Sequence, residues 1–528
     1  MSTRSHSGTH ADAIRAGRTA LGIEFGSTRI KACLIDATTH EVLATGFHDW
    51  ENRFEDRLWT YPLDAVWAGI QEAYAGLVSD AYDRHGIRPE TFGALGISAM
   101  MHGYLAFDDA GELLAPFRTW RNTNTGPAAA ELTELLGVNI PLRWSVAHLR
   151  QAQLDAEPHV ARVAAITTLA GYVHWKLTGQ RVLGIGDASG MFPIDSAARD
   201  YDQQLIARYD ARTGGDLRSL LPDVLVAGED AGSLSAEGAA LLDPTGALRP
   251  GIPLCPPEGD AGTGMVATDA VAPRTGNVSA GTSIFAMVVL ERPLAEVHHE
   301  LDLVTTPAGD AVAMVHCNNG ASELAAWVGM FVRFAEASGI HGSTDAVFET
   351  LFREALDGEA DAGGLMAYNH LAGEPIVGLD EGRPLFVRTP DSRFTLANVM
   401  RAQLYGVFGT LSLGMRVLEG EGVRLDRMFA HGGMFRTAGV AQRFLAGALN
   451  APVAVGDTAS EGGAWGIAVL AAFLGSDQDL SAHLHDQVFA DADIRIVDPD
   501  PADVAGYTTY LDRYRAGLAV EAAAVDAL

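Results

Sequence analysis

Residues 20–36 read ALGIEFGSTRIKACLID, in which two apolar runs flank the short turn Gly26-Ser27-Thr28. Two such runs around a tight turn predict a β-hairpin. The glycine lets the backbone come close to a ligand and the two hydroxyls can donate hydrogen bonds, so a turn of this kind can hold phosphate oxygens. Gly-Ser-Thr turns also occur in ordinary hairpins. This stretch alone therefore leaves a phosphate-binding hairpin and a plain hairpin equally open.

The second half of the chain contains a similar stretch. Residues 277–290, NVSAGTSIFAMVVL, again place a glycine and two hydroxyl residues, Gly281-Thr282-Ser283, between apolar runs. Gly281 follows Gly26 by 255 residues, nearly half of the 528-residue chain. One repeat at this spacing predicts two related domains, each presenting a phosphate hairpin to a shared cleft. Glu24 of the first copy is Ser279 in the second, so an acid in one copy only indicates divided roles.

Length and composition favour two domains with substantial cores. A chain of 528 residues exceeds what one core usually serves, and 48 % of its residues are hydrophobic. A break in composition at residues 271–276 precedes the second hairpin. We therefore expect a flexible N-terminal tail over 1–19, an N-terminal domain over 20–271 and a C-terminal domain over 272–528.

The charge of the chain limits its partners. The formal net charge is −30, from 37 basic and 67 acidic residues, which disfavours nucleic acid or an anionic membrane as a partner of the whole surface. A local basic pocket for a small phosphate is compatible with this balance. The first 19 residues lack the apolar core of a signal peptide, and no run reaches 18 apolar residues. We expect a cytoplasmic protein, and the sequence leaves its oligomeric state open, a homodimer included.

Lysine and cysteine are rare in this chain, and both can take part in ligand binding or catalysis. Lys31, just after the first turn, is one of two lysines in the chain, and a phosphate contact and a solvent-facing strand residue are equally open for it. Cys33, Cys255 and Cys317 lie far apart in apolar runs without metal-binding spacing. They predict free buried thiols in a reducing compartment.

Polar and aromatic residues gather after a buried strand in the first half. The strand expected over 92–98 runs into residues 99–104, AMMHGY, and ligands of open α/β sheets bind outside the carboxyl ends of strands. Farther on, residues 117–125, FRTWRNTNT, combine aromatic rings, arginines, amides and hydroxyls. This mixture is typical of sugar sites, and a solvent loop of chance polarity is the alternative.

Two aspartates of the first half lie at loops that could carry chemistry. Asp187 lies in the glycine-rich segment 184–190, where an acid that stabilises the loop as an Asx-turn is favoured over a catalytic one. Asp260 lies where a short strand ends and a helix of small residues begins. A carboxylate there can be a general base or an N-cap, and spacing alone favours the cap.

The second half ends in glycine-opened helices. Residues 396–418 predict a long, centrally buried helix, and residues 427–435, RMFAHGGMF, predict a strand that ends in Gly432-Gly433. A helix follows over about 438–448, and another begins at residues 461–464, EGGA. Glycines at such a strand–helix turn allow the base or ribose of a nucleotide to lie against the backbone.

Taken together, these stretches resemble the FGGY family of carbohydrate kinases. Residues 22–28 and 279–283 look like its two phosphate motifs, 99–103 like the Gly-Gln-Met-His-Gly of its xylulokinases, 187–190 with Asp195 like an internal landmark, 259–261 like its Gly-Asp-Asn, and 432–433 with 461–464 like its adenosine region. The resemblance spans about residues 20–475. It implies an α/β chain with the two-domain actin-like/Hsp70-like ATPase (ribonuclease H-like) fold and an interdomain cleft.

The resemblance also implies roles for individual residues. Asp260 would be the catalytic base, and Glu24 would lie by the Mg²⁺–phosphate centre, with no direct metal ligand assigned. Sugar contacts would come from Met101, His102, Trp120, Arg121, Asn122 and Asp260. ATP contacts would come from Gly26, Ser27, Thr28, Lys31, Gly281, Thr282, Gly432 and Gly433. The chain departs from the family pattern at Glu24, normally aspartate, at Ala261, normally asparagine, and at residues 120–122, Trp-Arg-Asn for Trp-Asn-Asp.

The expected activity is ATP-dependent phosphorylation of a ketopentose, with ATP, Mg²⁺ and a small sugar as partners. D-xylulose is the first choice because of the Met-His-Gly and Asp-Ala-Ser-Gly motifs, L-ribulose comes next, and glycerol and gluconate rank lower. A different class, an actin-like nucleotide-binding regulatory protein without kinase activity, is the alternative. The Met-His-Gly loop and Asp260 count against it, because a pure switch needs neither.

Overall fold

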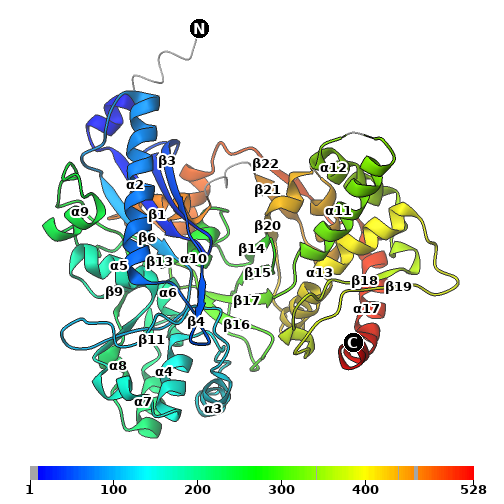
Figure 1. The fold of residues 1–528 in the computed structure, drawn as a ribbon, viewed down its shortest axis with the longest axis horizontal. Helices are drawn as coiled ribbons and strands as arrows, with labels where there is room; N and C mark the ends of the chain where they lie inside the picture. The colour runs from blue at the N-terminus through cyan, green and yellow to red at the C-terminus, as the bar shows by residue number, and fades with distance from the viewer. Residues whose placement is uncertain (1–9, 341, 438, 457–461) are drawn as a thin grey trace. The chain divides into compact units, whose positions relative to one another are not determined.

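The computed structural model describes residues 10–340, 342–437, 439–456 and 462–528 (Figure 1). The chain forms two compact units. Unit 1 comprises residues 1–271, 303–312 and 458–491, and unit 2 comprises residues 272–302, 313–457 and 492–528. No helix among the described residues is both long and apolar enough to cross a membrane.

Unit 1 is built on a five-stranded sheet that begins with the opening hairpin. The strand order is β13 (Glu258–Gly259), β6 (Ala94–Ala99), β1 (Thr19–Phe25), β2 (Arg29–Asp36) and β3 (Val42–Asp49). The first three strands of the chain pair antiparallel, whereas β6 lies parallel to β1 and β13 lies parallel to β6. Because β1, β6 and β13 run in one direction, their carboxyl ends meet at one edge of the sheet.

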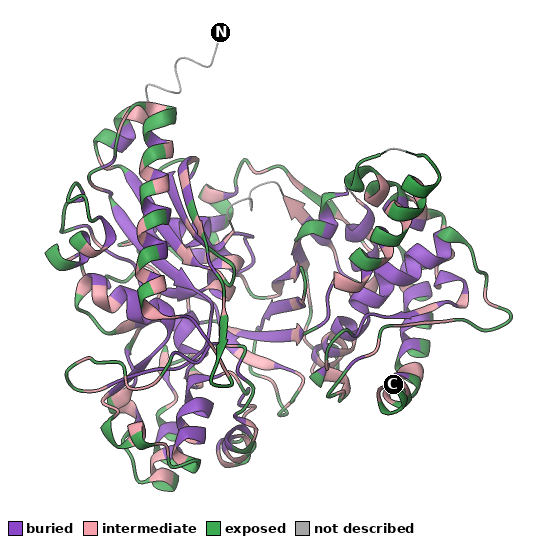
Figure 2. Ribbon diagram, viewed as in Figure 1, coloured by how far each residue is buried: buried purple, intermediate pink, exposed green. Residues whose placement is uncertain are grey.

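One helix packs closely on each face of this sheet. Helix α2 (Leu63–His85) lies on one face, where a Cβ on Gly46 would stand 2.0 Å from the Ala73 carbonyl oxygen. Helix α15 (Gly463–Ala472) lies on the other, where a Cβ on Gly22 would stand 2.1 Å from the Ala464 carbonyl oxygen. Figure 2 shows the strands between them largely buried. Glycines in the strands therefore permit both helices to approach this closely.

Unit 1 contains further helices and small sheets outside this sheet. The helices are α3 (Gly126–Leu136), α4 (Ser145–Leu154), α5 (Leu169–Thr178), α6 (Ile185–Ala188), α7 (Gln203–Thr213), α8 (Leu217–Leu220), α9 (Ala236–Leu242), α10 (Asp260–Val266) and α16 (Leu480–His483). Small two-stranded sheets pair β4 (Arg53–Glu55) with β5 (Leu58–Thr60), β7 (Leu105–Phe107) with β8 (Ala165–Thr167), β9 (Val182–Gly184) with β12 (Asp223–Leu225), and β10 (Ile194–Asp195) with β11 (Asp200–Tyr201).

Unit 2 repeats the strand order of unit 1. The sheet that contains the second hairpin has seven strands, in the order β16 (Asp302–Thr305), β17 (Ala311–Cys317), β15 (Ile284–Val289), β14 (Thr275–Ala280), β20 (Arg427–His431), β21 (Val453–Gly456) and β22 (Ile494–Val497). The hairpin β14–β15 is antiparallel and β20 and β21 continue in parallel, as β1–β2, β6 and β13 do in unit 1. The internal repeat predicted from the two Gly-hydroxyl turns is therefore a repeat of topology, and the predicted α/β fold class is confirmed.

Helices cover the sheet of unit 2. They are α11 (Ser322–Ala337), α12 (Thr344–Glu354), α13 (Leu396–Gly420), α14 (Val440–Leu449) and α17 (Pro501–Ala527), and a hairpin joins β18 (Met366–Tyr368) to β19 (Leu385–Val387). Helix α13 is buried along most of its length, as its apolar sequence predicts. It packs on the sheet through Gly414, where a Cβ would stand 2.3 Å from a methyl of Val315.

The predicted domain ranges need two corrections. Residues 10–15, assigned to a flexible tail, are helical with Ala13 and Ile14 buried, and β1 already begins at Thr19. Residues 303–312 and 458–491, assigned to the C-terminal domain, cluster with unit 1. The physical reason is packing: Thr305 bonds the Ile185 carbonyl, and α15 lies on the sheet of unit 1.

Candidate active site

A row of polar side chains crosses the carboxyl edge of the unit 1 sheet. Cross-strand pairing aligns Lys31 with Glu24, Glu24 with Ser98, and Ser98 with Glu258, on four adjacent strands. Directly paired residues point to the same face of a sheet, so the four side chains share one face. Thr263 of α10 meets this row from above, with its hydroxyl 3.1 Å from that of Ser98. The row brings together the predicted residues Glu24 and Lys31 and adds Ser98, Thr263 and Glu258.

Glu24 is held at the start of α15. The Ala464 amide donates to Glu24 Oε2 at 3.2 Å, in the first turn of that helix. A Cβ on Gly463 would stand 2.4 Å from Glu24 Oε1, so only glycine leaves room for this carboxylate. A carboxylate at a helix N-terminus is stabilised by the amide it accepts and by the helix dipole. Of the predicted adenosine motif, Gly462, Gly463 and Ala464 are described and Glu461 lies outside the described residues.

The turn Gly26-Ser27-Thr28 has its carbonyl groups bound by the protein. The Trp50 indole donates to the Gly26 carbonyl at 2.7 Å, the Tyr61 hydroxyl to the Ser27 carbonyl at 2.6 Å, and the Trp50 amide to the Thr28 carbonyl at 3.1 Å. Ser27 and Thr28 are exposed. With its acceptors turned inward and its hydroxyls outward, the turn has the polarity that an anion requires. Trp50 and Tyr61 were not predicted, because nothing in their sequence spacing links them to the turn.

The turn of the second hairpin is built in the same way. The Ala321 amide donates to the Gly281 carbonyl at 2.8 Å, and the Gly320 amide donates to the Thr282 carbonyl at 2.7 Å. Thr282 is exposed. Gly432, at the end of β20, adopts φ 118°, and a Cβ there would stand 2.1 Å from the Ala280 carbonyl oxygen. The predicted glycines of unit 2 therefore lie at the carboxyl ends of neighbouring parallel strands, and Gly433 is exposed next to them.

Asp260 is the first residue of α10 and faces the loop that follows β6. The Met101 amide donates to Asp260 Oδ1 at 3.0 Å. The backbone amides of Ala261 and Asp260 also interact with this carboxyl group and, like that of Met101, lower its pKa. Burial raises the pKa of Asp260 above its usual value, which makes it a stronger base when ionised. The carboxylate is thus held at the start of α10 against the loop that follows β6.

The loop after β6 is held in a strained conformation. His102 has φ 73°, in the left-handed region that non-glycine residues rarely adopt. Its Nδ1 lies 3.4 Å from the Gly190 carbonyl, and a Cβ on Gly190 would collide with the imidazole. Strain of this kind is maintained where the surrounding structure requires it. The structure therefore brings Met101, His102 and Asp260 to one place.

The segment Trp120-Arg121-Asn122 is fixed against Trp59. The Arg121 guanidinium lies 3.8 Å from the Trp59 ring centroid and is exposed. Asn122 is buried, and its amide donates to the carbonyls of Trp59 at 2.8 Å and Thr119 at 3.1 Å while its oxygen accepts the Trp59 amide at 2.9 Å. Both amide protons of Asn122 are thus used within the protein, which gives this residue a structural role, and its sugar contact stays a prediction.

Two acids near Asp260 are deeply buried. Asp187 accepts the Thr168 hydroxyl at 2.6 Å, and burial raises its pKa to about 7. Glu258 accepts the amides of Gly186 at 3.3 Å and Asp187 at 2.9 Å, and burial raises its pKa to about 8. The Asx-turn interpretation of Asp187 is wrong, because this residue lies in helix α6 and its side chain bonds a distant threonine. Glu258 was not singled out, although it precedes Asp260 by two residues.

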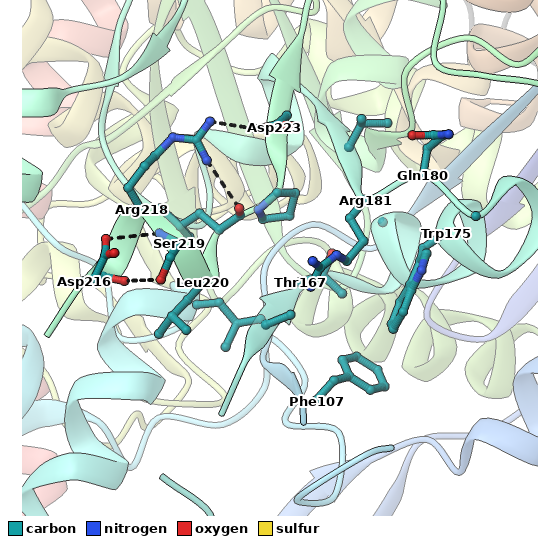
Figure 3. Close-up of a pocket in the computed structure, with 17 residues that line it drawn as sticks. Phe107, Thr167, Trp175, Gln180, Arg181, Asp216, Arg218, Ser219, Leu220 and Asp223 are labelled. Carbon is teal, nitrogen blue, oxygen red and sulfur yellow. Dashed lines mark hydrogen bonds and ion pairs between the residues drawn. The ribbon is translucent and has the colours of Figure 1, made fainter. Parts of the chain in front are cut away.

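A pocket of about 630 Å³ lies elsewhere in unit 1 and contains none of the predicted site residues (Figure 3). Phe107, Trp175 and Arg181 line one part of it, and the ion pair between Arg218 and Asp223, at 2.8 Å, lies at another. Thr167 lines this pocket, and the next residue, Thr168, bonds Asp187.

Comparison with known families decides the relationship. The model of the N-terminal domain of the FGGY family of carbohydrate kinases matches residues 19–266, and that of its C-terminal domain matches residues 276–474. The chain belongs to this family. The predicted resemblance is confirmed, and the protein is a xylulokinase-like carbohydrate kinase.

Individual relatives agree on the fold and differ in their named substrates. A xylulose kinase of Haemophilus influenzae is 21 % identical over 425 residues, covering 78 % of this chain and 82 % of the relative. A solved xylulose kinase of Rhodospirillum rubrum superimposes with TM-score 0.78 at 21 % identity, covering 95 % of this chain and 99 % of its own. A gluconate kinase of Lactobacillus acidophilus gives TM-score 0.77 at 17 % identity, covering 95 % and 98 %. At such identities the structures show the fold alone.

Proposed function

We propose that this FGGY kinase transfers the γ-phosphoryl group of ATP to a hydroxyl of a ketopentose, with D-xylulose as first choice and Asp260 as general base. The observation that carries the proposal is the Met101–Asp260 hydrogen bond of 3.0 Å. It fixes the carboxylate of Asp260, the proposed acceptor of the substrate proton, against the loop that contains His102.

In the proposed reaction, Asp260 Oδ2 takes the proton of the sugar hydroxyl while the oxygen of that hydroxyl forms a bond to the γ-phosphorus of ATP. The bond between the γ-phosphorus and the bridging oxygen breaks, and ADP leaves. Phosphoryl transfer depends on positioning and charge stabilisation more than on covalent chemistry. The raised pKa of Asp260 supports its part, because proton transfer is efficient when the base is not too weak.

ATP would contact the two glycine turns and the glycines that follow β20. The amides and hydroxyls of the turns beginning at Gly26 and Gly281 would bind phosphate oxygens, with Lys31 adding a positive charge from the row that crosses the first sheet. Gly432 and Gly433 would lie beside adenosine, since a strand end without side chains admits a planar base. The inward-bound carbonyls of both turns support this assignment.

Mg²⁺ would be held by Glu24 together with ATP. The described residues contain no group of three or more acidic, histidine or cysteine side chains that could hold a metal alone. This donor set fits Mg²⁺, which is commonly bound by one or two carboxylates with substrate phosphates and waters. When bound, the ion neutralises charge on the transferring phosphate.

The identity of the phosphorylated sugar is inferred from the relatives and from departures from the family pattern. Relatives that are named xylulose kinase support D-xylulose as the phosphoryl acceptor. Structural neighbours that are named gluconate kinase and glycerol kinase indicate that proteins of this fold act on several acceptors. L-ribulose is the second candidate, because Ala261 and Arg121 depart from the family pattern near the sugar. Family membership favours the kinase over a regulatory protein without activity.

The proposal is tested by measuring ADP release over a panel of ketopentoses, ketohexoses and polyols. We expect sugar-dependent release with the highest kcat/KM for D-xylulose. A maximum for L-ribulose would move the assignment to the second candidate. ATP binding without release by any acceptor would contradict the proposed reaction.

A further inference from the structure

Glu258 is a buried acid for which the proposed reaction has no use. Its side chain is 1 % exposed. It starts from β13, and its two carboxyl oxygens accept the amides of Gly186 at 3.3 Å and Asp187 at 2.9 Å. One side chain therefore links the strand that leads into Asp260 with the separate helix α6.

The chain provides a slot of the size of this carboxyl group. A Cβ on Gly184 would stand 2.2 Å from Glu258 Oε1, and a Cβ on Gly186 would stand 2.4 Å from Oε2. Neither glycine has a positive φ, so backbone conformation does not require glycine at either position. Room for the Glu258 carboxyl group therefore explains why both positions are glycine. The two glycines serve this contact and not an unusual backbone conformation.

The α6 segment and the residues that follow it lie close to the loop after β6, residues 99–104. Asp187 Oδ1 lies 3.3 Å from where a Cβ on Gly259 would be, and Met101 Cγ lies 2.9 Å from the same position. Three residues beyond Asp187, the Gly190 carbonyl lies 3.4 Å from His102 Nδ1. A shift of α6 away from β13 would therefore move the walls that hold Met101 and His102.

The side chain of Asp187 gives further evidence that α6 is held in a fixed position against β13. It is 1 % exposed, and its Oδ1 is buried without a hydrogen-bond partner among the residues that the structure describes, while Oδ2 accepts the Thr168 hydroxyl. A buried acceptor without a partner is costly and is kept only where the surroundings fix it. The Glu258 clamp on the Asp187 amide is one such restraint.

We propose that Glu258 is a positioning residue for phosphoryl transfer: it locks α6 onto β13 and so keeps Met101, His102 and Asp260 in one arrangement. This inference rests on the proposed function. Glu258 touches neither the sugar nor ATP, and it acts through the amides it binds. Its loss should therefore impair the use of the sugar and leave the handling of ATP unchanged.

The test replaces Glu258 and, independently, fills its slot. In Glu258→Gln an NH₂ group replaces one of the two oxygens that accept backbone amides, so two donors face each other. In Gly186→Ala the new methyl group displaces the carboxyl group of Glu258. Controls are Glu237→Gln, an exposed acid of α9, and Gly126→Ala, where no atom lies within 4 Å of the new methyl. We expect both test variants to lower kcat/KM for the sugar at least tenfold, with the KM for ATP near that of the controls.

The double variant Glu258→Gln/Gly186→Ala separates positioning from general damage. Because both changes break the same contact, the double variant should be little worse than either single variant. Sugar kinetics like the controls in both single variants, or losses that multiply in the double variant, would overturn the proposal. Equal increases in both KM values with a lowered melting temperature would reduce Glu258 to a structural role and also overturn it.

Hydrogen exchange gives a readout that does not depend on activity. The amides of Gly186 and Asp187 should exchange at least tenfold faster in Glu258→Gln than in the natural chain, and unchanged exchange would refute the clamp. If the natural chain phosphorylates no acceptor, the proposed function fails on that result alone, and the exchange measurement still decides whether Glu258 holds α6.

Discussion

The substitution Gly22→Ala probes the contact between β1 and α15. A Cβ on Gly22 would stand 2.1 Å from the Ala464 carbonyl oxygen and 2.6 Å from the Ala468 amide nitrogen. An ordinary contact starts at 3.4 Å, so α15 must retreat by about 1.3 Å. Backbone atoms cannot rotate away as a side chain can, so the whole helix has to move.

The energetic cost of this movement follows from overpacking. Inserting a methyl into a packed core typically costs about 1–3 kcal/mol, and replacing glycine returns about 0.4–1 kcal/mol by restricting the unfolded chain. We expect a net loss of about 1–2 kcal/mol, which for a unit of this size lowers the melting temperature by roughly 1–3 °C. The retreat also lengthens the 3.2 Å bond from the Ala464 amide to Glu24, so kcat should fall as well.

Thermal unfolding and urea titration measure the stability change, and ADP release measures the activity. The matched control is Gly126→Ala, where the new methyl meets no atom within 4 Å and stability should stay within about 0.5 kcal/mol of the natural chain. If Gly22→Ala unfolds at the same temperature as this control, α15 does not pack on β1 as described.

Three further predictions concern single residues. Burial raises the pKa of Glu258 from 4.5 to about 8, so the folded state holds a proton that the unfolded chain releases. Stability should therefore fall as the pH rises from about 4.5 to 8. The urea midpoint should fall less steeply with pH in Glu258→Gln than in the natural chain, and equal slopes would contradict this. In Glu24→Asp the shorter acid should lose the Ala464 amide and reduce kcat severalfold with an altered Mg²⁺ dependence; an unchanged rate and Mg²⁺ dependence would mean that the longer acid has no special task. Trp50→Phe removes the donor to the Gly26 carbonyl and should raise the KM for ATP about tenfold while the KM for the sugar stays constant; an unchanged KM for ATP would separate this turn from nucleotide binding.

The sequence was most informative where function is encoded locally. The two Gly-hydroxyl turns lie between alternating apolar runs, so both hairpins and their repetition could be predicted from residues 20–36 and 277–290. Asp260 was placed at a strand–helix boundary for the same reason, and the structure has it as the first residue of α10. Local periodicity and turn chemistry specify such features without reference to the rest of the chain.

Features that depend on distant contacts could not be predicted. Asn122 is held by Trp59, 63 residues away, and Glu24 accepts the amide of a residue 440 positions later. The burial of Glu258 depends on a slot formed by glycines more than 70 residues earlier. Charge and spacing give no indication that an acid will be buried, because its partners are brought to it only by tertiary packing.

Asp260→Asn tests whether Asp260 removes the proton of the sugar hydroxyl. The amide keeps the shape of the side chain and an oxygen for the Met101 amide but cannot accept the proton. We predict that kcat for sugar-dependent ADP release falls on the order of a hundredfold or more, while the KM for ATP and the melting temperature match those of the exposed-acid control Asp109→Asn. Near-normal turnover by Asp260→Asn would contradict the account.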